Sequence, residues 1–104
     1  MDMKTTVVNK SAAKYDVYIG RGSKWGNPYS HSENTKAKFK VNTRKQAIDA
    51  YKEYITKGDG KHLLKDLHEL EGKRLGCFCK PKACHGDILV ILLDSNILES
   101  ILYT

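Results

Sequence analysis

Residues 43–57 read Thr-Arg-Lys-Gln-Ala-Ile-Asp-Ala-Tyr-Lys-Glu-Tyr-Ile-Thr-Lys and carry the clearest structural signal in the chain. Thr43 and Gln46 have the spacing of a capping box, in which the two side chains bond to free amide groups at the start of a helix. Apolar residues then recur at helical spacing, and Gly58 marks a stop. The stretch therefore predicts an amphipathic helix, against which the remaining elements must pack.

The predicted helix has one apolar and one charged face. Tyr51, Ile48 and Ile55 fall on the apolar face, which we expect to be buried against a sheet. The charged face, which we expect to remain in water, carries Lys45, Lys52 and Glu53.

Strand and helix patterns alternate on either side of this helix. In chain order the sequence predicts strands at 5–9 and 15–19, the helix at 43–57, a shorter helix from about residue 60 to Gly72, a strand at 73–79, a helix from Cys84 and a short last helix from Asn96. Strands separated by helices are typical of α/β domains. A chain of 104 residues, 40% of them hydrophobic, is long enough for one core. We therefore expect residues 1–104 to form a small single α/β domain with a short mixed sheet and flanking helices.

A long polar segment, residues 20–42, separates the second predicted strand from the helix. It holds three glycines, one proline and many polar side chains, with no clear period. Loops of this length in small domains usually have a function. We expect this segment to be a loop that faces a ligand.

Hydropathy limits the surroundings in which the chain can act. The longest apolar run, residues 88–93, is too short for a membrane span, which needs about 18 residues. The N-terminal residues lack the apolar stretch of a secretory signal, so we expect a cytoplasmic protein with no membrane partner. Whether the chain forms a homo-oligomer stays open at this stage.

Positive charge is concentrated in the first part of the chain. The net charge is +6, and residues 1–42 contain eight basic and three acidic side chains. This distribution favours an anionic partner such as a nucleotide, a phosphate or a nucleic-acid backbone. A solvated basic face that only aids solubility is the alternative. A nucleic acid is the less favoured partner, because the sequence has no recognition-helix or aromatic-sheet signature.

The segment Gly-Arg-Gly-Ser-Lys-Trp-Gly-Asn-Pro, residues 20–28, has the composition of a phosphate-binding loop. Its glycines let a ligand approach the backbone closely, and its two cations suit phosphate. Trp25 offers a stacking surface for a planar ring, and Asn27 can both donate and accept hydrogen bonds. The spacing G-x-G-x-x-x-G matches neither the dinucleotide-binding nor the Walker pattern, which excludes kinase, ATPase and standard dehydrogenase functions.

This segment supplies the first group of candidate ligand contacts. They are Gly20, Arg21, Gly22, Ser23, Lys24, Trp25 and Asn27. The alternative interpretation is a structural turn, in which Trp25 fills the core and Asn27 and Pro28 make a bend.

Three cysteines lie close together at Cys77, Cys79 and Cys84, and His85 follows them. An odd number of clustered thiols is a poor disulfide framework and favours reduced cysteines. Three thiols and an imidazole could supply a tetrahedral zinc site, but structural zinc sites prefer two residues between paired cysteines. We therefore expect no metal as a structural requirement and assign no cofactor, while zinc occupancy of these four residues stays open. Cys77 and Cys79 also fit small core residues on a strand.

The residues Cys84, His85, Gly86 and Asp87 fall at the predicted start of a helix. Free amide groups and the helix dipole favour an anion there, which makes all four residues candidate ligand contacts. The same environment lowers the pKa of a cysteine, so Cys84 could act as a thiolate nucleophile with His85 or Asp87 as proton carrier. The alternative for Asp87 is a favourable charge at the helix start. No catalytic residue is assigned on these grounds.

Two stretches of the chain are similar to a known family. Tyr-Asp-Val-Tyr-Ile-Gly-Arg-Gly-Ser-Lys-Trp-Gly-Asn-Pro at 15–28 and Leu-Gly-Cys-Phe-Cys-Lys-Pro-Lys-Ala-Cys-His-Gly-Asp at 75–87 resemble the signatures of domain-of-unknown-function family 4326, found in phages and bacteria. The resemblance extends from about Thr5 to Leu93. It implies a small α/β domain in which the Gly-Arg-Gly loop and the Cys-His-Gly-Asp turn belong to one site. It also points to a phage origin, for which the expected location is the host cytoplasm.

These observations together lead to a hypothesis of function. The strands at 15–19 and 73–79 should lie side by side, with a crevice at their carboxyl ends. There we expect a nucleotide or an ADP-ribose-like molecule, with its phosphates on Arg21 and Lys24 and its ring on Trp25. A phage protein of this kind could sequester a host nucleotide signal and so evade immunity. The alternative is a small cysteine-dependent or metal-dependent enzyme that acts on a nucleotide or nucleoside.

Overall fold

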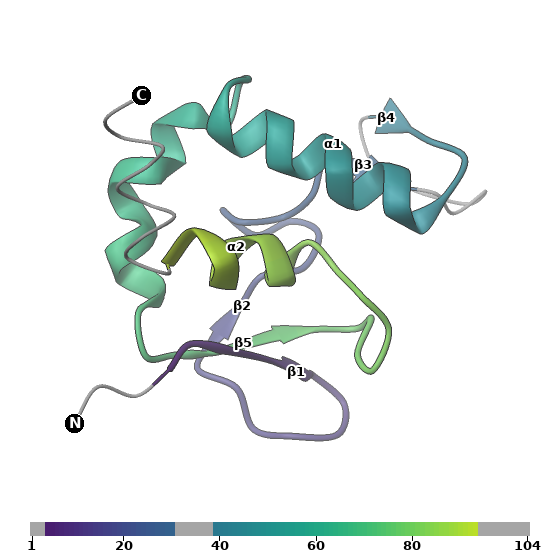
Figure 1. Ribbon diagram of the computed structural model, residues 1–104. Helices are drawn as coiled ribbons and strands as arrows, with labels where there is room; N and C mark the ends of the chain where they lie inside the picture. Colours follow the sequence, from purple (N-terminus) through teal and green to yellow (C-terminus); the bar gives the residue numbers. More distant parts are fainter. Residues whose placement is uncertain (1–3, 31–38, 94–104) are drawn as a thin grey trace.

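A computed structural model describes residues 4–30 and 39–93 of the chain (Figure 1). Its elements in chain order are β1 (Thr6–Asn9), β2 (Val17–Tyr18), β3 (Tyr29–Ser30), β4 (Phe39–Lys40), α1 (Arg44–Thr56), the 3₁₀ helix η1 (Lys61–Leu70), β5 (Arg74–Cys77) and α2 (Gly86–Leu93). The small single α/β domain predicted from the sequence is confirmed. The predicted last helix from Asn96 lies outside the described residues.

A three-stranded sheet in the order β1-β5-β2 forms the base of the domain. Val7 and Val17 both pair with Leu75, so β5 lies between the two strands, and both pairs are parallel. We expected a mixed sheet, but every strand pair among the described residues is parallel. The segment between β2 and β5 contains α1 and η1, and such a crossover lets two strands run in the same direction.

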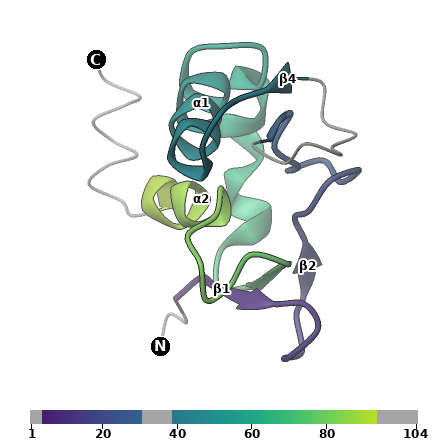
Figure 2. The same ribbon diagram turned by 90° about the vertical axis from the view of Figure 1, so that its right-hand side faces the viewer.

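The helices are stacked on one side of this sheet. In both ribbon views α2 lies between the sheet and α1 (Figures 1 and 2). The core between them is closed by large side chains that are almost fully buried, among them Tyr51, Ile55, Leu67, Leu70, Leu75 and Leu89. No described helix covers the opposite face of the sheet.

Helix α1 begins as the sequence predicts. The Thr43 side chain accepts a hydrogen bond from the Gln46 amide at 3.1 Å, and the Gln46 side chain accepts one from the Thr43 amide at 3.2 Å. Tyr51 and Ile55 are buried in the core, which confirms the predicted apolar face. Ile48 is only half-buried, because it lines a cleft beside the helix.

The described parts of the segment 20–42 contain two short strands that the sequence did not predict. They are β3 and β4, which pair in parallel with Tyr29 opposite Phe39, and the two rings stack with their centroids 5.0 Å apart. Two-residue strands have no period that a sequence pattern can reveal.

Among the described residues, no helix is long and apolar enough to cross a membrane.

Candidate functional site

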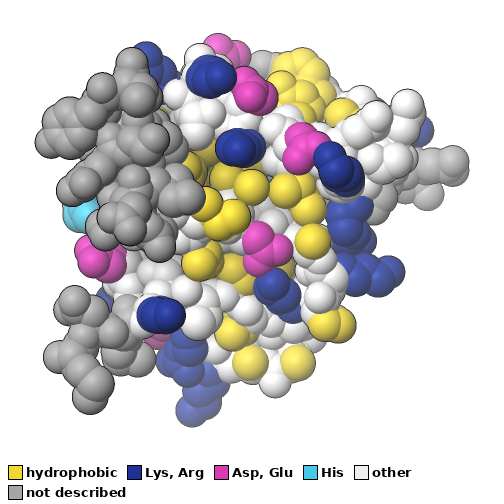
Figure 3. All heavy atoms as spheres, in the orientation of Figure 1, with side chains coloured by type: hydrophobic (Ala, Val, Ile, Leu, Met, Phe, Trp, Pro, Cys, Tyr) yellow, Lys and Arg dark blue, Asp and Glu magenta, His cyan; other side chains and the backbone are white. Residues whose placement is uncertain are grey.

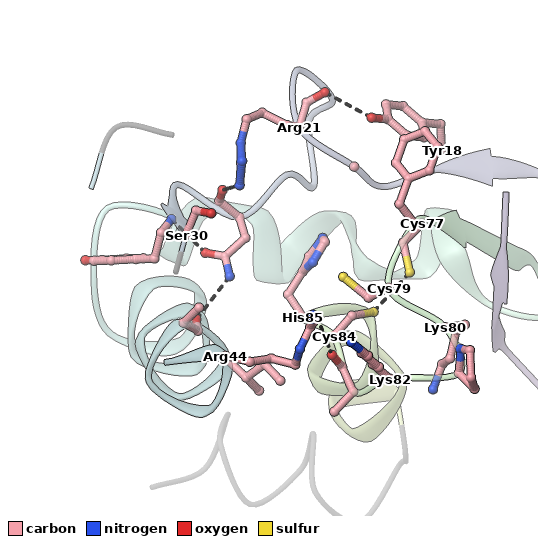
Figure 4. Close-up of a pocket in the computed structure, with 18 residues that line it drawn as sticks. Tyr18, Arg21, Ser30, Arg44, Cys77, Cys79, Lys80, Lys82, Cys84 and His85 are labelled. Atoms are coloured by element: carbon pink, nitrogen blue, oxygen red, sulfur yellow. Dashed lines mark hydrogen bonds between the residues drawn. The ribbon is translucent and has the colours of Figure 1, made fainter. Parts of the chain in front are cut away.

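A cleft of about 650 Å³ lies beyond the carboxyl ends of β2 and β5 (Figure 4). The two strands are hydrogen-bonded neighbours, as expected, with Tyr18 opposite Gly76. Ligands of open α/β sheets bind outside the carboxyl ends of the strands. Three parts of the chain line the cleft: the segment after β2, the first half of α1 and the connection from β5 to α2.

The cleft brings the two predicted groups of site residues together. Those that line it are Gly20, Arg21, Asn27, Cys84 and His85. The expectation that the Gly-Arg-Gly loop and the Cys-His turn share one location therefore agrees with the geometry. The remaining predicted contacts do not line the cleft, namely Gly22, Ser23, Lys24, Trp25, Gly86 and Asp87.

Trp25 belongs to the core and is only 3% exposed. Its carbonyl accepts a 2.9 Å hydrogen bond from the Tyr51 hydroxyl. A buried ring presents no face to a ligand, so the predicted stacking platform at Trp25 is wrong, and the alternative of a residue that fills the core is the one observed.

Lys24 is also turned away from the cleft. Its ammonium lies 2.9 Å from Asp66 and 3.0 Å from Glu69, both on η1. Its hydrogen bond to Asp66 and that to Glu69 raise the pKa of Lys24 above its usual value. The charge of Lys24 is therefore used to join the loop to η1, and the predicted phosphate contact is not placed at the cleft.

Ser23 and Gly22 shape the loop instead of lining the cleft. The Ser23 hydroxyl donates to the Gly20 carbonyl at 2.6 Å. Gly22 has a φ of 91°, a conformation that L side chains rarely adopt, which explains a glycine at this position.

Asn27 is buried and ties the loop to α1. Its Nδ2 donates to the Ala47 carbonyl at 3.0 Å, and its Oδ1 accepts the Tyr29 amide at 3.0 Å. Both ends of the amide are therefore bonded within the protein. The predicted role of Asn27 as a donor and acceptor for a base is replaced by a structural one.

Four basic residues line the cleft, and none of the lining residues is acidic. They are Arg21, Arg44, Lys80 and Lys82. Figure 3 shows basic side chains gathering along the right-hand edge of the face in view. Of these four basic residues, the sequence analysis predicted only Arg21 as a ligand contact. Lys80 and Lys82 lie inside the motif quoted above, whereas Arg44 comes from α1 and no local pattern connects it to the other three.

Hydrogen bonds hold the two arginines at the cleft. One guanidinium nitrogen of Arg44 donates to the Ala83 carbonyl at 3.2 Å, which joins α1 to the connection before α2. Arg21 makes a longer contact, 3.4 Å, to the Asn27 carbonyl. Lys80 forms a 2.8 Å ion pair with Asp87, and this hydrogen bond raises the pKa of Lys80. The result is a concave surface of net positive charge, which attracts anions.

His85 is buried at the floor of the cleft and is neutral. Its Nε2 lies 2.7 Å from the Ile19 carbonyl, and its ring packs edge-on against Tyr51 with centroids 4.9 Å apart. Burial lowers the pKa of His85 below its usual value. In its neutral form, His85 donates its Nε2–H to the Ile19 carbonyl. This hydrogen bond joins the residue before α2 to the residue after β2.

Cys84 caps the start of α2. Its sulfur accepts the Gly86 amide at 3.3 Å, while its own amide donates to Asp87 at 3.1 Å. Its sulfur also lies 3.2 Å from that of Cys77. Asp87 therefore provides the favourable charge at a helix start that the alternative interpretation foresaw. Gly86 is buried where a Cβ would come within 2.7 Å of Ile19.

The thiol of Cys84 is kept protonated. Hydrogen bonding to the Cys79 thiol, burial and the neighbouring Cys77 thiol raise the pKa of Cys84 far above its usual value. The helix start was expected to lower this pKa, but the thiol cluster and burial outweigh it. Cys84 as a thiolate nucleophile is therefore not supported. Within the described ranges, no three His, Cys, Asp or Glu side chains are arranged to hold a metal ion.

We expect iodoacetamide to alkylate Cys84 at least about tenfold more slowly than a free cysteine thiol near neutral pH, because only the thiolate reacts. Peptide mass spectrometry of the native protein measures the rate, and the protein unfolded in urea is the control. Cys79, which is only partly buried, should react before Cys84. Faster labelling of Cys84 than of Cys79 would contradict this environment.

Comparisons with known proteins place the chain in a family. The family model of a domain of unknown function, DUF4326, matches residues 4–95. The chain is 38% identical over 90 residues to an uncharacterized 12.4 kDa protein in the nrdA-td intergenic region of Enterobacteria phage T4, covering 85% of this chain and 76% of that protein.

A second viral protein is also similar. The chain is 29% identical over 113 aligned residues to an uncharacterized protein of Acanthamoeba polyphaga mimivirus, covering 84% of this chain and 79% of that protein. No solved structure matches the chain significantly. The family model spans both motifs and all of the described residues, and the chain therefore belongs to the DUF4326 family.

Proposed function

We propose that the protein binds a small anionic ligand, a nucleotide or an ADP-ribose-like molecule, in the cleft beyond β2 and β5. One observation carries this proposal: four cations and no carboxylate line a cleft of about 650 Å³ at the carboxyl ends of parallel strands. Cavities of this size suit small-molecule ligands, and this edge of an α/β sheet is where such ligands bind.

The cations differ in what they offer a phosphate. Arg21 and Arg44 carry planar guanidinium groups that can hold two phosphate oxygens at once, and they approach from opposite walls of the cleft (Figure 4). Lys82 adds a mobile point charge at the same opening. This division of roles supports a ligand with more than one anionic oxygen.

Binding without turnover is the better supported activity. Burial and the neighbouring thiols raise the pKa of Cys84, and burial lowers the pKa of His85, so both the thiolate and the imidazolium are disfavoured. Neither group is poised to attack a ligand or to accept a proton from it. Given the similarity to a phage protein, the use we propose for such binding is the sequestration of a host nucleotide signal.

A panel of AMP, ADP and ADP-ribose tests the proposal. We expect calorimetric titration to show binding of at least one, and mass spectrometry of the ligand released from heat-denatured protein to show it intact. Recovery of a chemically changed ligand would contradict binding without turnover and would show that the protein is an enzyme. The absence of binding by every member of the panel would contradict it.

Arg21→Ala should weaken ADP-ribose binding by about tenfold to a hundredfold, because a charge-assisted bond to phosphate is lost. Arg21→Lys should recover only part of this, since an ammonium lacks the planar fork. The melting temperature without ligand should hardly change, because Arg21 is exposed and substitutions of exposed residues usually cost less than about 0.5 kcal/mol.

Lys45→Ala is the matched control. It removes one positive charge from the exposed face of α1, where Lys45 pairs with Asp49 and does not line the cleft. Equal binding by Arg21→Ala and Lys45→Ala would show that the loop after β2 is only a turn.

A further inference from the structure

We propose that a planar base of the ligand stacks on the ring of Phe78 at the mouth of the cleft, with the ring of Tyr18 edge-on beside it. The inference rests on the proposed function and names the part of the ligand that the cations do not recognise. It also places the stacking surface that Trp25, buried in the core, does not supply.

The register of the sheet brings Tyr18, Phe78 and Lys10 to one face. Tyr18 is opposite Gly76, and side chains two residues apart on a strand point to the same side, so Phe78 follows on the same face. Lys10 comes directly after the Asn9–Cys77 pair and is next to Phe78. This is the face of the sheet that carries no described helix (Figure 2).

The two rings form a small aromatic surface with one cation over both of them. Their centroids lie 6.5 Å apart at an interplanar angle of 75°. The Lys10 ammonium lies 4.9 Å from the centroid of each ring. Phe78 is 60% exposed, the highest value among the exposed large hydrophobic residues of the described chain. An exposed phenylalanine at the mouth of a cleft marks a surface that a ligand can cover.

Hydrogen bonds fix the Tyr18 ring and the backbone that follows Phe78. The side-chain amide of Asn9 donates to the Lys80 carbonyl at 2.7 Å, which fixes the chain two residues after Phe78. The Tyr18 hydroxyl donates to the Arg21 carbonyl at 3.2 Å. A Cβ at Gly20 would overlap the Tyr18 ring, so the glycine allows the ring to fold back over the loop. The aromatic surface is therefore attached to the same loop as the Arg21 guanidinium.

The position of the rings fits a nucleotide better than a bare phosphate. Tyr18 and Phe78 line the cleft together with Arg21, Lys80 and Lys82, so an apolar wall and a cationic wall share one opening. Every nucleobase has a π-face that stacks on an aromatic ring, whichever base it is. The pair of rings therefore selects for the presence of a base more than for its identity.

AMP and ribose 5-phosphate form a matched pair of probes, because they share the phosphate and the sugar and differ in the base. We expect wild-type protein to bind AMP at least about tenfold more tightly than ribose 5-phosphate, as base stacking on an aromatic ring predicts. Phe78→Ala should remove most of this advantage while the affinity for ribose 5-phosphate changes less than about twofold. Phe78→Leu separates the aromatic face from apolar area, and we expect it to behave like Phe78→Ala.

Ile91→Ala is the control for loss of an exposed apolar side chain, since Ile91 is 47% exposed on α2 and does not line the cleft. A direct readout is the shift of Phe78 ring protons when AMP is added. The chain has two phenylalanines, and Phe78→Leu assigns their signals.

The outcomes separate this inference from the proposed function. Equal affinity of wild-type protein for the two probes, or an equal loss of both in Phe78→Ala, would overturn the stacking site and leave the anion site intact. Binding of neither probe would overturn the stacking site, and failure of ADP and ADP-ribose to bind as well would overturn the proposed function. Binding of single-stranded oligoadenylate through Phe78 with no binding of AMP would also overturn it, in favour of a nucleic-acid surface.

Discussion

Tyr51→Ala should lower the free energy of unfolding by about 3–5 kcal/mol, as for other fully buried large aromatic residues. The Tyr51 side chain is fully buried at the centre of α1, and its ring packs against His85. Its hydroxyl donates to the Trp25 carbonyl at 2.9 Å, and burial raises the pKa of Tyr51 so that this proton is retained. The substitution therefore removes the ring and a buried hydrogen bond together.

Urea denaturation of Tyr51→Ala and Tyr51→Phe measures the two contributions separately. Tyr51→Phe keeps the ring and leaves the Trp25 carbonyl without its donor, which should cost about 1–2 kcal/mol. A loss below about 1 kcal/mol in Tyr51→Ala would mean that a different face of α1 is buried.

Asn27→Ala should destabilise the protein by about 2–4 kcal/mol, because two buried backbone groups lose their only side-chain partner. These are the Ala47 carbonyl and the Tyr29 amide, each 3.0 Å from the Asn27 side chain. The measurement is again denaturant unfolding without ligand. The effect on folding distinguishes this residue from Arg21, whose loss should mainly affect binding.

Asn27→Asp is the informative partner variant. It keeps an acceptor for the Tyr29 amide but places a carboxylate oxygen against the Ala47 carbonyl, so most of the destabilisation should remain. If the free energy of unfolding of Asn27→Ala lies within about 0.5 kcal/mol of the wild-type value, the Asn27 side chain is not the link between the loop and α1.

Local signals predicted the helices well, because the information lies within a few residues. The capping box of Thr43 and Gln46 and the apolar face around Tyr51 depend only on spacing along α1. The direction of the strands depends on how distant segments meet. The parallel pairing of Val7 and Val17 with Leu75 results from crossovers, and no pattern within either strand encodes it.

The resemblance to a family implied that the Gly-Arg-Gly loop and the Cys-His turn lie together, but the sequence did not predict which residues line the cleft. The two segments meet because β2 and β5 are neighbours. Which aromatic residue lines the cleft is decided by the alternation of side chains across the sheet and by burial. Trp25 lies beneath the loop and Phe78 at the rim, and both read as isolated aromatic residues in the sequence.

The central place of β5 also has a consequence for how the chain folds during its synthesis. Within the described sheet, β1 and β2 have no partner other than β5, and the pairs join residues 6–9 and 17–18 to residues 74–77. Pairings between such distant segments form slowly, because a long loop must close first. The first two strands of a nascent chain therefore remain unpaired until β5 has left the ribosome. The cleft cannot be complete before then, because Phe78, Lys80 and Lys82 follow β5 in the chain.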